Sequence, residues 1–313
     1  EAPRERQALD PASGDRGEEG PEEPGSVVDQ ARSLLARNEH RQARRLLERW
    51  VRTNLGDERY AEAEFLLGEA YFEAGHFYAA YEHYEIVIEN ASGGLFQKGL
   101  RREGDGARAF FAGQPRIVWG FLRLPAFDDG FQILDRVWER APGTRLGEEA
   151  LRLKADARYA RGEFDLAQDE YAALAREYPA GRYAPLALLR AAESAANAFV
   201  GTEFDASPLD QAEERYAQVS QAFPIYAESQ AVPARLEGIR RQRAEKDFSI
   251  ARWYERTGQG GAAEFYYRAI LADYPDTVIA SQARNRLRGL GVRVDEPRSE
   301  EHTSELQSRV DIS

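Results

Sequence analysis

Residues 67–87 read LGEAYFEAGHFYAAYEHYEIV, and this stretch decides the fold. Ala80 is followed by Tyr84 four residues later and by Val87 seven residues later. Offsets of four and seven place side chains on one face of a helix. A second apolar pattern, Leu-Gly-x-x-Tyr, precedes it, and Gly75 lies between the two. The stretch therefore predicts two helices joined by a short turn, with the small side chain of Ala80 where they approach each other.

The same spacing recurs along the chain, with a small residue, a bulky one at the fourth and seventh positions after it, and often Pro at the twelfth. Because Pro cannot continue a helix, it ends the second helix in the units that carry it. The six instances are Ala43-Leu47-Trp50-Leu55, Ala80-Tyr84-Val87-Ser92, Gly130-Leu134-Val137-Pro142, Ala167-Tyr171-Leu174-Pro179, Ala212-Tyr216-Val219-Pro224 and Ala263-Tyr267-Ile270-Pro275.

Repeated helix pairs of this kind resemble the tetratricopeptide pattern, whose period is about 34 residues. We therefore predict an all-α, tetratricopeptide-like α-solenoid of about six antiparallel helix pairs over residues 26–290, with no sheet and with a concave face. The small residues lie further apart than one ideal period, so some units carry longer helices or insertions. Residues 199–207 are one expected insertion.

The two ends do not share this pattern. Residues 1–25 hold eight acidic residues against three Arg, with four Pro and four Gly. Such a segment buries too little apolar surface to offset its ordering entropy, so we expect a disordered acidic tether. We expect residues 291–313 to be a disordered tail. Residues 298–308, RSEEHTSELQS, resemble the translation of a sequencing-library adapter, so 298–313 are interpreted as artefactual.

Composition limits the possible chemistry. The formal net charge of −12 argues against a nucleic-acid partner and the basic stripe that would bind it. The chain has no Cys, and no apolar run is long enough to cross a bilayer. Its four His lack the further ligands that a metal site needs. No nucleophile elbow or phosphate loop is found. We therefore predict a protein that is not an enzyme and that binds no cofactor or metal.

Residues 107–124 read ARAFFAGQPRIVWGFLRL and combine aromatic residues with three Arg and no acid. Two interpretations remain open. A cationic amphipathic segment can contact a lipid surface or a partner. The same residues can also form the first helix of a repeat, whose apolar face packs between its neighbours. We favour the helix, because stacked repeats require one at this point.

Three segments carry a resemblance to a known family: 177–192 (EYPAGRYAPLALLRAA), 204–216 (FDASPLDQAEERY) and 248–287, which begins FSIARWYERTGQGGAAEF. They resemble the outer-membrane β-barrel assembly lipoproteins of the BamD type. The resemblance implies a lipid-anchored protein on the periplasmic face of the outer membrane. It would scaffold β-barrel assembly by binding unfolded outer-membrane proteins and other subunits of the machinery. This sequence contains neither the signal peptide nor the lipidated Cys of that family.

On this hypothesis, repeat grooves hold an extended client peptide through aromatic and charged side chains. The peptide-binding candidates are Tyr60, Glu64, Tyr71 and Tyr78, and the candidates for docking to a partner subunit are Arg252, Arg284 and Arg288. The alternative is a periplasmic repeat adaptor for cell division or envelope maintenance. Such adaptors carry an N-terminal coiled coil, and residues 1–25 show no heptads.

Overall fold

The computed structural model describes residues 24–119, 121–203 and 205–294. The predicted tether (except its last two residues) and the residues from 295 onward lie outside these ranges. The described part contains fourteen helices and one two-stranded sheet. The chain divides into two compact units, Glu1–Ile133 and Leu134–Ser313, whose boundary falls inside one helix.

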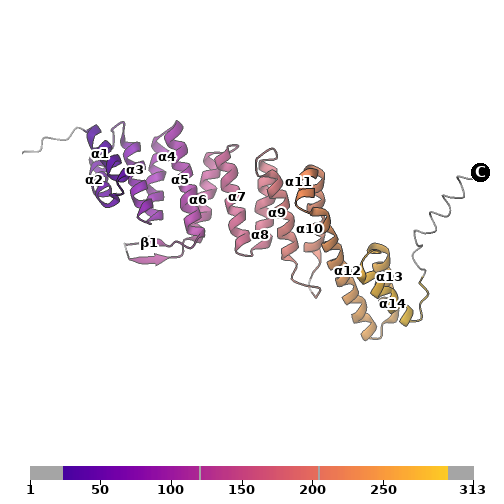
Figure 1. The fold of residues 1–313 in the computed structure, drawn as a ribbon. Helices are drawn as coiled ribbons and strands as arrows, with labels where there is room; N and C mark the ends of the chain where they lie inside the picture. Colours follow the sequence, from indigo (N-terminus) through magenta and orange to yellow (C-terminus); the bar gives the residue numbers. More distant parts are fainter. Residues whose placement is uncertain (1–23, 120, 204, 295–313) are drawn as a thin grey trace, which may run out of the picture. The chain divides into compact units, whose positions relative to one another are not determined.

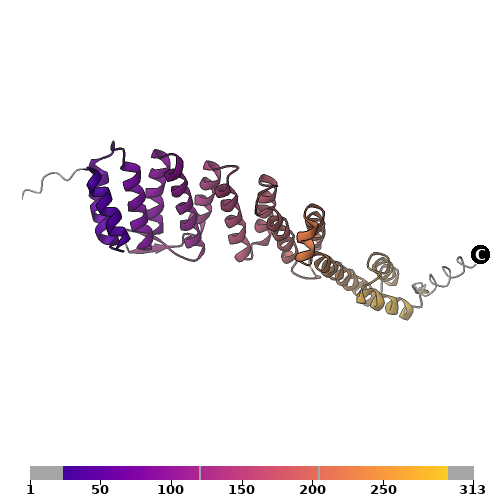
Figure 2. The ribbon, with the colours of Figure 1, turned by 45° about the horizontal axis from the view of Figure 1, so that its top comes forward.

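The first unit is a row of helices in which each packs on the next (Figures 1 and 2). Alternate helices also touch, because α1 contacts α3 and α3 contacts α5. Helices α1, α3 and α5 are each the first helix of a pair. They therefore share one face of the unit, which we call the first-helix face. The helices are α1 (Pro24–Ala36), α2 (His40–Thr53), α3 (Tyr60–Glu73), α4 (Phe77–Asn90) and α5 (Gly93–Phe111), followed by the start of α6 (Phe127–Arg140).

The second unit continues with the same kind of pairing, since α7 contacts α8, α9 contacts α10, and α12 contacts α13. Two helices depart from the regular lengths. The short α11 and the 25-residue α12 lie between two consecutive small residues, Ala212 and Ala263, and account for their wide spacing. The helices are α7 (Arg145–Ala160), α8 (Phe164–Glu177), α9 (Ala184–Ala198), α10 (Ser207–Ala222), α11 (Pro224–Ser229), α12 (Val232–Arg256), α13 (Gly260–Asp273) and α14 (Val278–Gly289).

The turns inside three pairs are built alike. Gly75, Gly162 and Gly258 have φ of 78°, 74° and 78°, a left-handed conformation that costs glycine little. In each turn the next amide donates to a carbonyl five residues earlier, as His76 N does to Tyr71 O at 2.9 Å. This is the hydrogen bond of a Schellman motif. Glycine at this point therefore ends the first helix and turns the chain into the second.

The core confirms the repeated pattern. The five Ala at the small position are all 0% exposed, and the sixth small residue, Gly130, is buried. The bulky residues four positions later are also buried: Leu47, Tyr84, Leu134, Tyr171, Tyr216 and Tyr267. Gly130 shows why the residue is small, because an added Cβ would lie 2.7 Å from Cε1 of Phe111. The all-α fold of about six antiparallel, tetratricopeptide-like pairs is thus confirmed.

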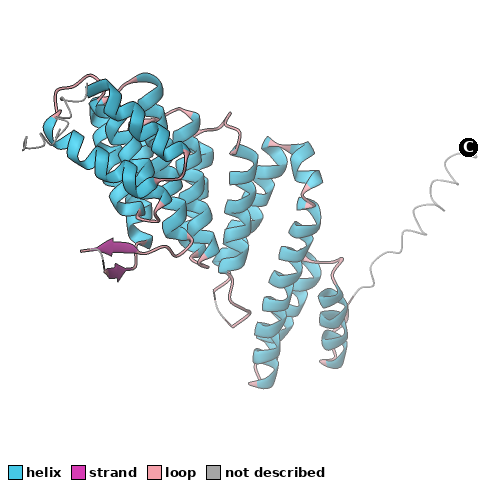
Figure 3. Cartoon of the chain, turned by 60° about the vertical axis from the view of Figure 1, so that its left-hand side comes forward, coloured by secondary structure: helices cyan, strands magenta, loops and turns pink. Residues whose placement is uncertain are grey.

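The expectation of no sheet is wrong. Strands β1 (Arg116–Val118) and β2 (Leu122–Leu124) form an antiparallel hairpin between α5 and α6 (Figure 3). The favoured helix over residues 107–124 is therefore wrong beyond Phe111, where α5 ends. Gly113 has φ of 90°, and Pro115 and Pro125 flank the strands, so the backbone cannot continue as a helix. The hairpin is the insertion that widens the spacing of this unit.

Candidate peptide-binding surface

Two of the predicted peptide-binding residues lie together in the first unit. The Tyr71 hydroxyl donates to Glu48 Oε1 at 2.6 Å, and the Tyr71 ring stacks on His83 with centroids 5.1 Å apart. His83 Nδ1 lies 2.7 Å from Glu64 Oε2. We call the set Arg44, Glu48, Tyr71, His76 and His83 the turn cluster, because it joins α2 and α4 beside the α3–α4 turn.

Glu64 occupies a different position from the one expected. Only 2% of it is exposed, and its carboxylate also accepts a hydrogen bond from the Tyr60 hydroxyl. Burial and these two partners hold the carboxylate inside the unit. Glu64 can therefore act on a bound peptide only through Tyr60 and His83, and not by direct contact.

Tyr78 lies apart from the turn cluster. Its ring is covered by the guanidinium of Arg116 in β1, with Cζ 3.5 Å from the ring centroid, and it contacts Tyr81 at 5.7 Å between centroids. A cation above an aromatic face is an attractive contact. Tyr78 therefore fixes the hairpin to α4.

Burial and neighbouring acids raise the pKa of two tyrosines. The pKa of Tyr71 is raised to about 12 by burial and by the hydrogen bond to Glu48. The pKa of Tyr60 is raised to about 12 by burial and by the hydrogen bond to Glu64. In both cases the folded state prefers the protonated hydroxyl, because an anion would be desolvated beside a carboxylate.

A test follows from the sign of these shifts. The unfolded tyrosine titrates near pH 10, so the stabilisation is complete below about pH 10 and is lost as pH rises towards about 12. We expect the free energy of unfolding in urea to fall over this window. In Tyr71→Phe the fall should be smaller. The pH titration of the tyrosinate absorbance should then show one fewer hydroxyl that ionises at high pH. An identical titration curve for both chains would contradict the buried hydroxyl.

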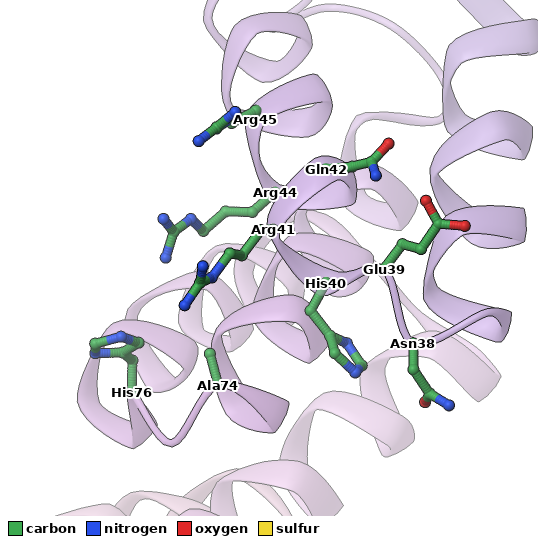
Figure 4. A pocket seen from close by; sticks show the side chains of 9 residues that line it. All are labelled: Asn38, Glu39, His40, Arg41, Gln42, Arg44, Arg45, Ala74 and His76. Atoms are coloured by element: carbon green, nitrogen blue, oxygen red, sulfur yellow. The ribbon is translucent and has the colours of Figure 1, made fainter.

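A basic hollow of about 760 Å³ adjoins the turn cluster. Arg41, Arg44 and Arg45 project from the same side of α2, and His76 comes from the α3–α4 turn (Figure 4). Among the described residues, neither Arg41 nor Arg45 pairs with a carboxylate. Arg49 and Arg52 extend the same charge along α2.

A second hollow, of about 600 Å³, opens where α1, α3 and the α4–α5 turn meet. Phe65, Leu66 and Leu95 contribute its apolar lining, and Lys98 stands at its edge. Lys98 is exposed and, within the described ranges, pairs with no acid. The other cation, Arg32, is bound to Asp29 at 2.7 Å and to Glu62. We call this the Phe65 hollow; it offers an apolar floor, one unpaired cation, Lys98, and one exposed carboxylate, Glu58, from the turn before α3.

The first-helix face continues past this hollow along α3 and α5. Arg102 donates to Glu69 Oε1 at 2.7 Å, and its guanidinium lies over the Phe72 ring, 4.6 Å from the centroid. The Tyr84 hydroxyl donates to the same carboxylate at 2.6 Å. Charged and aromatic groups therefore alternate on this face, with fixed side-chain positions.

The three arginines expected to dock a partner lie in the second unit. Arg252 is on α12, whereas Arg284 and Arg288 are on α14, and these two helices are in contact. Arg252 and Arg284 are half-buried and Arg288 is exposed. The structure thus brings them onto neighbouring helices, and their role stays a prediction.

Sequence reasoning missed Phe65, Lys98 and the arginines of α2. The five Arg of α2 are visible in the sequence, but the overall charge of −12 conceals them. Lys98 belongs to the next helix pair, and no spacing within one helix brings it to Phe65. In the ranges described, no three His, Asp or Glu side chains converge as metal ligands would. None of the helices described is long and apolar enough to cross a bilayer.

Comparison with solved structures returns repeat proteins of low identity. The chain is similar to the C-terminal part of a tetratricopeptide-repeat protein from Cytophaga hutchinsonii (13% identity, 83% of this chain and 87% of that one, TM-score 0.42). It is also similar to PilF of Pseudomonas aeruginosa (12%, 84% and 97%, TM-score 0.32) and to PilW, a type IV pilus biogenesis factor (13%, 83% and 97%, TM-score 0.31). With scores this low, the fold assignment rests on the helix pairs themselves.

No model of a known protein family matches the sequence, and comparison with curated proteins gives no match. The resemblance to the BamD type therefore remains a hypothesis from the three quoted segments.

Proposed function

We propose that this chain is a non-enzymatic protein-binding scaffold that holds an extended client peptide, and that its clients are unfolded outer-membrane β-barrel proteins. The observation that carries the proposal is the Phe65 hollow with Lys98 at its edge. The final strand of such barrels commonly ends in an aromatic residue. That residue presents a ring and a terminal carboxylate side by side, which suit an apolar floor and a free cation.

The rest of the first-helix face supports an extended ligand. Phe72, Glu69 and Arg102 lie on α3 and α5 in fixed positions, so a client could continue along the face beyond the hollow. An extended peptide needs polar partners for its backbone and pockets for alternate side chains. Preorganised side chains reduce the entropy lost on binding.

We also propose where the protein is located and which partner it docks. The resemblance to the BamD type favours the periplasmic face of the outer membrane, with a lipid anchor outside this sequence. Arg252, Arg284 and Arg288 would dock a partner subunit of the assembly machinery. Guanidinium groups on adjacent helices suit carboxylates of a partner, because they bind them in a bidentate manner.

The test is fluorescence anisotropy with a labelled strand peptide that ends in Phe. We expect a dissociation constant near micromolar, or about −8 kcal/mol, because ordering a flexible client offsets much of the contact energy. Amidation of the peptide's C-terminus should weaken binding about tenfold, or roughly 1.4 kcal/mol. In Lys98→Ala the acid and the amide should bind equally, since the cation that distinguishes them is gone.

Two controls locate the surface. Phe65→Ala should weaken binding of both peptides, whereas Phe265→Ala, which removes an exposed ring from α13, should leave binding unchanged. Circular dichroism must show that the helices of Phe65→Ala are intact. If Tyr71→Ala and Arg41→Ala weaken binding while Phe65→Ala and Lys98→Ala do not, the peptide occupies the turn cluster and the basic hollow.

A scrambled peptide separates the two candidate functions. Equal binding of the strand peptide and the scrambled peptide, or binding of neither, would remove the barrel-assembly proposal. The periplasmic adaptor for cell division or envelope maintenance would then be the function to test.

A further inference from the structure

The β1–β2 hairpin is unusual in a chain this acidic. From Gly106 to Phe127 the sequence has three Arg and no acid, although the protein has 54 acidic residues. The hairpin therefore offers positive charge and apolar side chains without the negative charge that surrounds it elsewhere.

Its tip exposes large apolar side chains. Trp119 is 81% exposed and Phe121 is 78% exposed. Leu122 and Leu124, on β2, are 38% and 40% exposed. Single exposed apolar side chains scattered over a surface are normal, whereas several large ones close together mark a contact site. These two exposed rings therefore indicate a contact surface.

The backbone of the tip is held in a costly conformation. Trp119 has φ of 52°, a value that glycine adopts readily and bulky residues adopt rarely. The Phe121 amide donates to the Val118 carbonyl at 3.4 Å and closes the loop. Strain of this kind persists where a function uses it, and here it directs a Trp away from the core.

The base of the hairpin is fixed although its tip is exposed. Arg116 lies over the Tyr78 ring and is 3.3 Å from Asp129 through its Nη1, so β1 is tied to α4 and α6. Arg123, directly opposite Ile117 in the register, is exposed and pairs with no acid among the described residues. The hairpin therefore presents two rings and one free guanidinium from a rigid base.

The surroundings of the base are also basic. Tyr78 is two residues beyond His76, which lines the basic hollow together with Arg41 and Arg45. Two acids of this region are neutralised, because Glu39, which lines the basic hollow, pairs with Arg37 at 3.1 Å and Asp129 pairs with Arg116. Asp128, and Glu82 one helical turn after Tyr78, are exposed acids near the base. Arg123 on the hairpin and Arg41 and Arg45 in the hollow pair with no acid among the described residues, so an anionic surface would meet three unpaired guanidinium groups against these two acids.

We propose that Trp119, Phe121 and Arg123 dock this unit on an anionic membrane surface. The two rings enter the boundary between headgroups and acyl chains, where Trp is favoured because its ring is apolar and its N–H is polar. Arg123 contacts headgroup phosphates, and the arginines of α2 add long-range attraction. An anionic lipid surface would repel acidic residues, and the whole segment has none. A lipid surface is therefore favoured over a protein groove. The proposal is independent of peptide binding.

The test uses the full chain with vesicles of phosphatidylcholine alone and of equal parts phosphatidylcholine and phosphatidylglycerol. We expect cosedimentation with the mixed vesicles and much less with phosphatidylcholine. The double variant Trp119→Ala with Phe121→Ala should weaken binding to the mixed vesicles about tenfold or more. Arg123→Glu should weaken it on the mixed vesicles only, because it reverses the charge and leaves the rings in place.

The matched control removes the same two ring types elsewhere. Trp253 and Phe265, on α12 and α13, are 50% and 68% exposed, and replacing both by Ala should leave vesicle binding unchanged. Equal loss in both double variants, or no loss in either, would overturn the proposal. If the unchanged chain binds neither vesicle, the proposal also fails, and the hairpin is then a contact for a protein. The peptide assay contains no lipid, so its outcome does not affect this one.

Discussion

A Gly68→Leu chain should unfold at a clearly lower urea concentration, with a loss of about 3 kcal/mol in the free energy of unfolding. Gly68 lies on α3 where α4 comes closest, and an added Cβ would be 2.5 Å from Cε1 and 2.9 Å from Cδ1 of Tyr84. The ring has no room to move, because Tyr84 is 1% exposed and its hydroxyl is bonded to Glu69. The helices must therefore separate, and the Glu69–Arg102 contact on the first-helix face should weaken as well.

A glycine without neighbours gives the control. Gly104, inside α5, has no atom within 4 Å of an added Cβ. Gly104→Ala should raise stability by up to about 1 kcal/mol, because alanine favours the helix over glycine. If Gly68→Leu also raised stability, the close approach of α3 and α4 would be wrong. Chemical denaturation followed by circular dichroism measures both variants.

The features of the fold that could be predicted are those that depend on the spacing of residues within one helix. A small residue followed by a bulky one four positions later recurs because every pair needs the same close approach, so one pattern located all six pairs. The hairpin was missed for the opposite reason. Its aromatic residues and arginines fit an amphipathic helix equally well, and only Pro115 and Pro125 indicated that no helix could run through. Those two prolines should have outweighed the composition.

The candidate surface was less predictable, because it depends on contacts between helices. Tyr60 and Glu64 are one helical turn apart, which correctly placed them together, but nothing in that spacing showed that Glu64 faces His83 in the interior. The Phe65 hollow joins residues of α1, α3 and α5, and Lys98 comes from a different pair. Periodicity within a helix shows which residues share a face, and it does not show which face the next helix covers.

An Ala263→Leu chain tests the second unit in the same way and should lose about 2 kcal/mol, within the usual range for overpacking a core. Ala263 is 0% exposed and lies in a cluster with Ala251, Tyr267 and Ala280. Four buried alanines in this cluster, with Ala283 the fourth, mean that α12, α13 and α14 approach closely, and Leu adds three heavy atoms to this core. The hydroxyl of Tyr267, bonded to Glu255 at 2.7 Å, prevents its ring from yielding.

The matched control is Ala272→Leu on the same helix. Ala272 is exposed, so the same added atoms meet water and the free energy of unfolding should change by no more than about 0.5 kcal/mol. Equal unfolding midpoints for the two variants would mean that α13 is rotated relative to its neighbours and that the sixth pair is assigned in the wrong register. A loss confined to Ala263→Leu would show that the small position fixes the distance between helices in the last pair as Gly68 does in an earlier one.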